Sequence, residues 1–270
     1  MGWINDTFLS EGYKEVYIMR YLHFTSVNRM LIENLNSKRP FSLIRLGDGE
    51  YTVLKYKKWT TRARCLDRIN RWFDAFKLSE KEVISIRNQI LRACQEASLL
   101  GIASANELRY YSKWKSFESI CKSLKIPLTN TFFFHDVLKL NYKEILKDRN
   151  VVCITCRDIE DKIKKNFAPA TIKTILIRPE KFAWRSCFKG QDTRSDCKDH
   201  YHVQFEEIYK MIMSTSQKGV LYLIGAGGLG KSYCNLVKNQ GGMGLDIGSL
   251  FDIWSGSQTR PYLKRGWILK

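Results

Sequence analysis

Residues 41–50 read FSLIRLGDGE, and this stretch decides the fold. Its first part is mostly apolar and carries one charge, which predicts a short buried strand over residues 41–46. Gly47 and Gly49 then leave the backbone free to turn tightly. A strand that ends in such a turn is typical of open α/β sheets, where ligands bind at the carboxyl ends of the strands.

The alternation of strands and helices continues along the chain. Further strands are predicted where short apolar or β-branched runs occur, at residues 99–103, 151–155, 171–177, 220–224 and 245–247. Helices are predicted where apolar residues recur at helical spacing, at residues 27–35, 83–94, 114–124 and 208–212. Ser79, with Glu82 three residues later, predicts a capping box before the second helix. The pattern predicts an α/β domain with a mostly parallel sheet flanked by helices and an N-terminal helical region packed on it.

Composition places the chain among ordinary globular proteins. Its 270 residues are 44% hydrophobic and 27% charged, which excludes collagen-like, disordered and low-complexity classes. We expect residues 1–270 to form one domain. The first 13 residues are mixed polar and acidic, unlike a signal peptide, so a cytoplasmic location is expected.

The charge balance points to an anionic partner. Lys and Arg number 45 against 27 Asp and Glu, a formal net charge of +18. This charge suits a nucleic acid, a phosphorylated small molecule or an acidic membrane surface. The basic residues are scattered and not in blocks, which weakens the nucleic-acid interpretation.

The first motif that can carry chemistry is the turn at residues 45–50. In an extended segment, Asp48 and Glu50 would point to the same side, and such paired oxygens suit Mg²⁺ or Mn²⁺ held together with substrate phosphates. Arg45 can hold a phosphate by a bidentate contact. The alternative is an ordinary polar turn with a solvated acidic pair.

The second motif, GAGGLGKS at residues 225–232, matches two phosphate-binding patterns at once. Gly225, Gly227 and Gly230 fit the dinucleotide fingerprint, and Lys231 and Ser232 complete a Walker A pattern. The 38 residues after Ser232 are too few for the rest of either fold. The milder prediction is a turn that binds phosphate or a nucleotide. The alternative is a helix start with small residues for close packing.

The third motif is GLDIGSLFDIW at residues 244–254. Asp246 lies in a short apolar strand bounded by glycines, and Asp252 follows on a predicted turn. Each carboxylate can act as a general base, accept a hydrogen bond from a sugar hydroxyl, or cap a helix.

Together the three motifs, in this order over residues 41–256, resemble the GT-D-type glycosyltransferases. That family carries an Asp-x-Glu pair after a strand, a late glycine-rich turn with a basic residue, and then an Asp-Ile-Gly segment. The matching residues are Arg45, Gly47, Asp48, Gly49 and Glu50; Gly225, Gly227 and Lys231; and Asp246, Ile247 and Gly248. Leu46 stands where the family has Phe, and residues 249–254 lack the family's His and acidic run, so the catalytic base is not carried over.

The resemblance implies a Rossmann-like fold and a hexosyltransferase-class enzyme with a nucleotide-sugar donor, of which a UDP-sugar is favoured. It implies Mn²⁺ or Mg²⁺ at Asp48 and Glu50, and a glycan or lipid-linked acceptor in surface polysaccharide or glycoprotein synthesis. The residues expected to bind the donor are Arg45, Gly47, Gly49, Gly225, Ala226, Gly227 and Lys231.

Two catalytic assignments and two competing functions complete the expectations. An inverting transferase needs a base for the acceptor hydroxyl, and Asp246 and then Asp252 are the candidates. The basic surface predicts a peripheral contact with an anionic membrane at its inner face. The competing functions are a P-loop-type NTPase that uses residues 225–232 and a basic nucleic-acid-binding protein. No recognised nucleic-acid-binding motif is present, so no nucleic-acid partner is expected.

Overall fold

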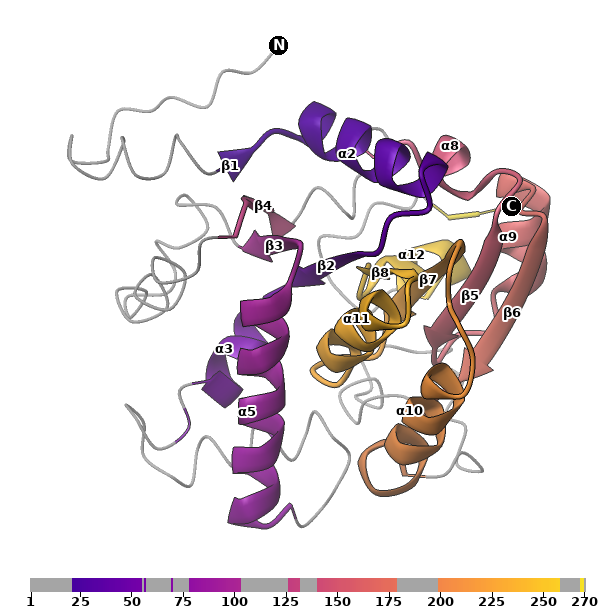
Figure 1. Cartoon of the computed structure of the whole chain (residues 1–270). Helices are drawn as coiled ribbons and strands as arrows, with labels where there is room; N and C mark the ends of the chain where they lie inside the picture. Colours follow the sequence, from indigo (N-terminus) through magenta and orange to yellow (C-terminus); the bar gives the residue numbers. More distant parts are fainter. Residues whose placement is uncertain are drawn as a thin grey trace, which may run out of the picture.

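The computed structural model describes residues 21–54, 56, 69, 78–102, 126–131, 140–178, 199–257 and 268–269 (Figure 1). The helix predicted over residues 114–124 and the first 20 residues lie outside this set. Within it, the alternation predicted from the sequence forms one parallel sheet with helices on both faces, which confirms the expected α/β class.

Among the described residues the sheet has eight strands in the spatial order β1-β4-β3-β2-β8-β7-β5-β6, and every neighbouring pair is parallel. Three central strands, β2, β8 and β7, come from opposite ends of the chain. The strands are β1 (Tyr21–Leu22), β2 (Phe41–Arg45), β3 (Leu99–Ile102), β4 (Leu128–Asn130), β5 (Asn150–Thr155), β6 (Thr171–Leu176), β7 (Val220–Gly225) and β8 (Met243–Asp246).

Helices cover both faces because successive residues of a buried strand point to opposite sides. In β2, Leu43 belongs to the apolar cluster under α2, α8, α9 and α12, whereas Ile44 belongs to the cluster under α3, α5, α10 and α11. The helices of the first face are α2 (Phe24–Asn36), α8 (Tyr142–Leu146), α9 (Glu160–Phe167) and α12 (Leu250–Ser255). Those of the second are α3 (Asp48–Leu54), α5 (Glu80–Glu96), the π-helical turn η3 (His200–Gln204), α10 (Phe205–Met213) and α11 (Gly230–Asn239).

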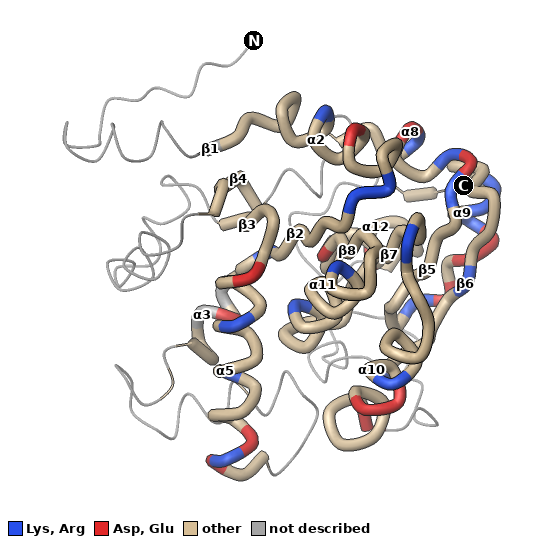
Figure 2. Tube along the Cα trace, viewed as in Figure 1, with Lys and Arg blue, Asp and Glu red and all other residues tan. Residues whose placement is uncertain are grey.

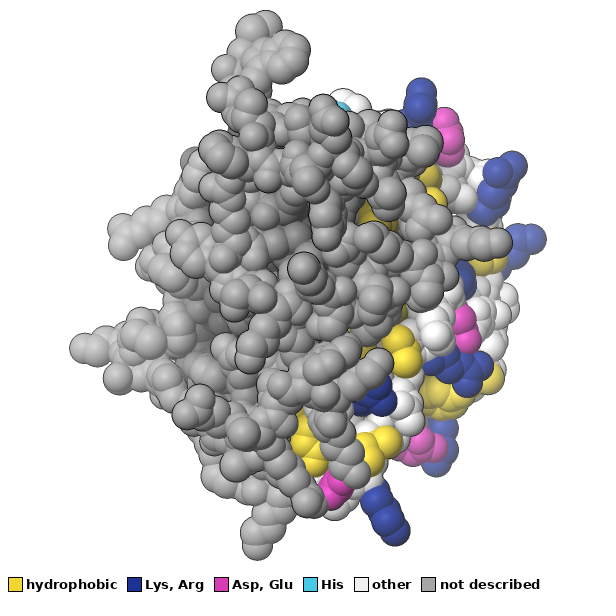
Figure 3. Space-filling view, turned by 90° about the vertical axis from the view of Figure 1, so that its left-hand side faces the viewer, with side chains coloured by type: hydrophobic (Ala, Val, Ile, Leu, Met, Phe, Trp, Pro, Cys, Tyr) yellow, Lys and Arg dark blue, Asp and Glu magenta, His cyan; other side chains and the backbone are white. Residues whose placement is uncertain are grey.

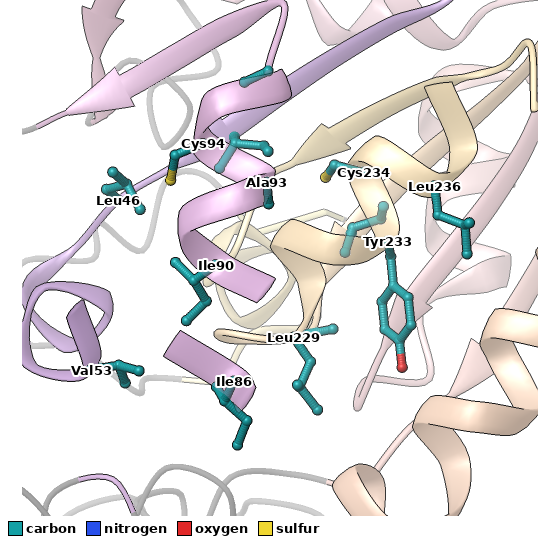
Figure 4. Close-up of a cluster of buried hydrophobic side chains, with 14 of the residues drawn as sticks. Leu46, Val53, Ile86, Ile90, Ala93, Cys94, Leu229, Tyr233, Cys234 and Leu236 are labelled. Carbon is teal, nitrogen blue, oxygen red and sulfur yellow. The ribbon is translucent and has the colours of Figure 1, made fainter. Parts of the chain in front are cut away.

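Two helices far apart in the sequence, α5 and α11, face each other on the second side (Figure 4). The buried Ile90 and Cys94 of α5 lie in the same apolar cluster as Leu229, which precedes α11, and Cys234 of α11. The predicted capping box is present at the start of α5, where Ser79 accepts from the backbone N–H of Glu82 and Glu82 accepts from that of Ser79. This packing holds α11 against the sheet at the point where the candidate site forms.

One of the predicted strands differs from the observed strand by more than a single residue. The strand expected at residues 245–247 begins earlier, at Met243, because Gly244 continues the ladder between β2 and β7. A Cβ atom at position 244 would lie 2.7 Å from the backbone of Cys234, so only glycine lets α11 approach β8 this closely. The short elements β1, β4, α3, α8, α9 and α12 were not predicted. Asp252, expected on a turn, lies in helix α12, because the apolar Leu250, Phe251, Ile253 and Trp254 around it are buried.

Candidate active site

The carboxyl edge of the sheet brings parts of the three motifs together. Arg45 ends β2, Asp246 ends β8 and Gly225 ends β7. The registers pair Leu43 of β2 with Leu245, and Ile224 of β7 with Asp246, so the three strand ends are neighbours. The expected convergence of the motifs at one sheet edge is therefore observed for these residues.

A buried ion triad forms the centre of this edge. The Lys231 ammonium, on the first turn of α11, lies 2.9 Å from Oε1 of Glu50 and 2.6 Å from Oδ2 of Asp246. The three side chains are 5%, 7% and 3% exposed, respectively. Asp246 Oδ2 also accepts the backbone N–H of Arg45 at 3.1 Å. One lysine thus links α11 to the first turn of α3 and to the end of β8.

The turn after β2 is helical and not extended. Helix α3 begins at Asp48, so the segment that holds Asp48 and Glu50 is helical. The expectation of an extended segment is wrong. The reason is the cap: Glu50, at the third helical position, accepts the backbone N–H of Gly47 at 2.9 Å through Oε2. Gly49 is buried in the same first turn.

The charges of the triad stabilise one another. Burial by itself would raise the pKa of Glu50, but the charge and hydrogen bond of Lys231 outweigh burial and lower that pKa below its ordinary 4.5. For Lys231, burial would lower the pKa, whereas Asp246 and Glu50 raise it well above its usual range. Glu50 and Lys231 are therefore ionised at neutral pH.

Glu50 in this arrangement does not fit a metal ligand. Both of its oxygens are engaged, one by Lys231 and one by Gly47. At 4 Å and an effective dielectric constant of 20, two unit charges interact by about 4 kcal/mol, so a divalent ion beside the ammonium meets strong repulsion. Within the part of the chain that the structure describes, no group of three or more His, Cys, Asp or Glu is arranged to hold a metal. The side chain of Asp48 lies outside the described residues, so a metal ion there stays a prediction.

Arg45 connects the triad to the neighbouring strands. Its Nε donates to Oγ1 of Thr131, just after β4, at 3.2 Å, and its Nη1 donates to the carbonyl of Ile247 at 2.8 Å. Gly248, which has a positive φ of 51°, lies against this guanidinium, and a Cβ there would be 2.6 Å from Nη1. The Asp-Ile-Gly segment therefore shapes the backbone around Arg45.

The glycine-rich turn is shaped largely by packing. A Cβ at Gly225 would lie 2.5 Å from the ring of Phe251, and one at Gly230 would lie 2.9 Å from Ile224. Ala226 is buried, whereas Gly227 is partly exposed and has a φ of 53°. Close packing accounts for Gly225 and Gly230.

The lysine of the Walker-like pattern does not serve a P-loop in this arrangement. The Lys231 side chain is buried, and its ammonium is held by Glu50 and Asp246. A P-loop lysine instead reaches the phosphates of its nucleotide.

Asp252 has a partner that the sequence did not reveal. Arg157 follows the carboxyl end of β5 and is 4% exposed, and its Nε lies 2.8 Å from Oδ1 of Asp252 on α12. Trp254, two residues along α12, is fully buried and its ring lies edge-on to that of Tyr142. The sequence did offer one signal for Arg157. A strand was predicted to end at Thr155, and a cation just beyond the carboxyl end of a strand is expected at the same edge of the sheet.

Comparison with known proteins identifies the family. The model of the GT-D fold-like domain matches residues 22–176, more than half of the chain. The chain belongs to the GT-D-like family. The matched region contains Arg45, Glu50 and Arg157 but ends before the second and third motifs.

Solved structures confirm the fold. A glycosyltransferase with domain of unknown function 1792 from Streptococcus sanguinis is 13% identical, with a TM-score of 0.53 over 86% of this chain and 82% of that one. A structure described as having a distinct glycosyltransferase fold is 12% identical, with a TM-score of 0.54 over 86% and 79% of the two chains. No curated protein sequence matches the chain. The expected GT-D-type glycosyltransferase is therefore confirmed at the level of family and fold.

Proposed function

We propose that this protein transfers a sugar from a nucleotide-diphosphate donor, most readily a UDP-sugar, to a glycan or lipid-linked acceptor. The observation that carries the proposal is the convergence of Arg45, Lys231 and Asp246 at one sheet edge in a chain of the GT-D-like family. Arg45 lies 201 positions before Asp246 in the sequence. In α/β sheets this edge is where ligands bind.

The backbone around the site suits the diphosphate of such a donor. Helices α3, α9, α11 and α12 follow β2, β5, β7 and β8, so their N-termini begin at the carboxyl edge. Helix N-termini carry partial positive charge and free N–H groups, which attract phosphate. Gly227, in the turn before α11, is partly exposed and is proposed to approach the donor.

The base for the acceptor hydroxyl is proposed among the two paired aspartates. Asp246 is 3% exposed and is held by Lys231, whereas Asp252 is 16% exposed and is held by Arg157. Asp252 is the more accessible of the two, which favours it as the group that meets the acceptor.

The net positive charge of the chain suggests where the reaction takes place. We propose synthesis of a surface polysaccharide or glycoprotein in the cytoplasm, with peripheral contact to an anionic membrane. The net charge of +18 supports such a contact. Among the described residues, no helix has both the length and the apolar character needed to cross a bilayer.

The competing functions receive less support. The engaged, buried Lys231 argues against a P-loop NTPase. On the face shown in Figure 3, the coloured basic side chains stand among acidic, apolar and other groups and do not form one continuous surface.

Ligand binding and donor turnover test the proposal. Melting temperature is measured with UDP, GDP, CDP, ADP and ATP, each with EDTA and with Mn²⁺, and release of nucleoside diphosphate from the matching nucleotide sugars is followed. A ligand at 100 times its Kd stabilises the folded state by about 2.7 kcal/mol, so we expect one nucleoside diphosphate to raise the melting temperature by about 5 °C.

Two matched variants locate the binding. Arg45→Gln should lose at least half of the ligand-induced shift, whereas Arg39→Gln, at an exposed position before β2, should keep it. Folding of both is checked by circular dichroism. The proposal fails if no nucleoside diphosphate shifts the wild type and no nucleotide sugar is turned over.

A further inference from the structure

A cation of this chain already lies between the carboxylates of the site. The Lys231 ammonium is within 2.9 Å of Glu50 Oε1 and within 2.6 Å of Asp246 Oδ2. The two carboxylates come from α3 and from the end of β8, and Lys231 comes from α11. All three side chains are buried, so this contact is not a chance encounter of exposed groups.

The other oxygen of Glu50 is also engaged. Oε2 accepts the backbone N–H of Gly47 and caps the first turn of α3. The same oxygen would be 3.2 Å from a Cβ at position 47, a tight contact that glycine avoids. Each oxygen of Glu50 therefore has a partner within this chain.

We propose that Lys231 is the resident cation of this site and that Glu50 positions it, so that Glu50 is not a metal ligand in this protein. This differs from what the Asp-x-Glu pattern implies. The inference concerns the same edge of the sheet as the proposed function. Its test measures cation binding and not sugar transfer, so either can fail without the other.

Removing the ammonium should convert the triad into a metal site. In Lys231→Met, Glu50 and Asp246 would keep carboxylate oxygens around the point that the ammonium occupied. Carboxylate oxygens are the ligands that Mn²⁺ and Mg²⁺ prefer. Lys231→Arg keeps the positive charge at the same position and is the matched control, because it should exclude the metal as wild type does.

The experiment titrates Mn²⁺ into the full chain without nucleotide and measures free Mn²⁺ by electron paramagnetic resonance. We expect Lys231→Met to bind one Mn²⁺ at least tenfold more tightly than wild type. Lys231→Arg should bind as wild type does, and the double variant Lys231→Met/Glu50→Gln should lose the gain. A folded Lys231→Met that gains no Mn²⁺ binding would overturn the proposal.

A second comparison decides the question if Lys231→Met does not fold. Glu50→Gln in the wild-type background keeps an oxygen for the Gly47 cap and the shape of the side chain. We expect Mn²⁺ affinity to change by less than about twofold relative to wild type. A one-to-one Mn²⁺ site in wild type that weakens tenfold or more in Glu50→Gln would show that Glu50 is a metal ligand and would overturn the inference.

Discussion

The charged side chains at the two edges of the sheet differ in burial: those described here are buried and paired at the carboxyl edge and exposed at the amino edge. At the carboxyl edge, Glu50, Lys231 and Asp246 are at most 7% exposed and are paired with one another. At the amino edge, Lys38 and Lys218, which precede β2 and β7, are exposed. Figure 2 shows basic positions along the segment before β2.

Buried charges need a specific explanation because burial is unfavourable for them, whereas exposed charges do not. Burying an ion pair has a desolvation penalty, and apolar residues of similar volume are often at least as stabilising. The charges at the carboxyl edge are thus poorly explained by stability alone, which supports a functional role. Lys38, by contrast, lies just beyond the C-terminus of α2, where a cation complements the helix dipole.

The largest expected loss of stability follows from replacing Lys231, the cation of the buried triad. Lys231→Met leaves two buried carboxylates without their cation and should lower the free energy of unfolding by about 3–5 kcal/mol. Lys218→Met, at the amino edge, should change it by less than about 0.5 kcal/mol. Urea unfolding at pH 7 measures both. Equal losses in the two variants would show that the two edges do not differ in this way.

The second effect concerns the pair that the sequence did not reveal. Arg157→Met leaves Asp252 without its buried guanidinium and should cost about 1–3 kcal/mol of unfolding free energy. The exposed Arg39→Met is the matched control and should stay within about 0.5 kcal/mol of wild type. Urea unfolding again provides the values, and an Arg157 variant as stable as the control would contradict the pairing.

The smallest effect concerns two histidines of one segment, His200 and His202, whose pKa values are shifted in opposite directions. Burial lowers the pKa of His200, whose Nε2 lies 3.1 Å from the hydroxyl of Tyr233, to about 4. For the more exposed His202, burial is outweighed by hydrogen bonds and charge from Glu82 and Asp199, which raise its pKa.

The signs follow from linkage. The stability contributed by a neutral His200 is present above its unfolded pKa of about 6.5 and is lost as the pH falls toward 4. The contribution of His202 is present below about pH 6.5 and is lost as the pH rises through its raised pKa. His200→Gln should therefore flatten the acid slope of the unfolding free energy between pH 6.5 and 4.5, and His202→Gln should remove stability only on the acid side. Identical pH profiles for the two variants would contradict the assignment.

Much of the sheet could be predicted because strands buried on both faces are marked by β-branched and apolar runs. Residues 151–155 and 220–224 are such runs, and both form strands with nearly the predicted bounds. The two-residue β1 and three-residue β4 are too short to carry such a signal. Helix α3 was missed because its cap uses Gly47 with Glu50 in place of the usual Ser or Thr.

The sequence by itself determined the α/β class, most of the strands and the residues that meet at the carboxyl edge, because periodicity and strand ends are local properties of the chain. Only the tertiary structure decided which charges pair. Lys231 is 181 positions from Glu50 but lies 2.9 Å from it, because β8 inserts between β2 and β7 and α11 packs against α5. No local pattern records that adjacency, and so the partners of Lys231, and of Arg157, follow from the order of the strands.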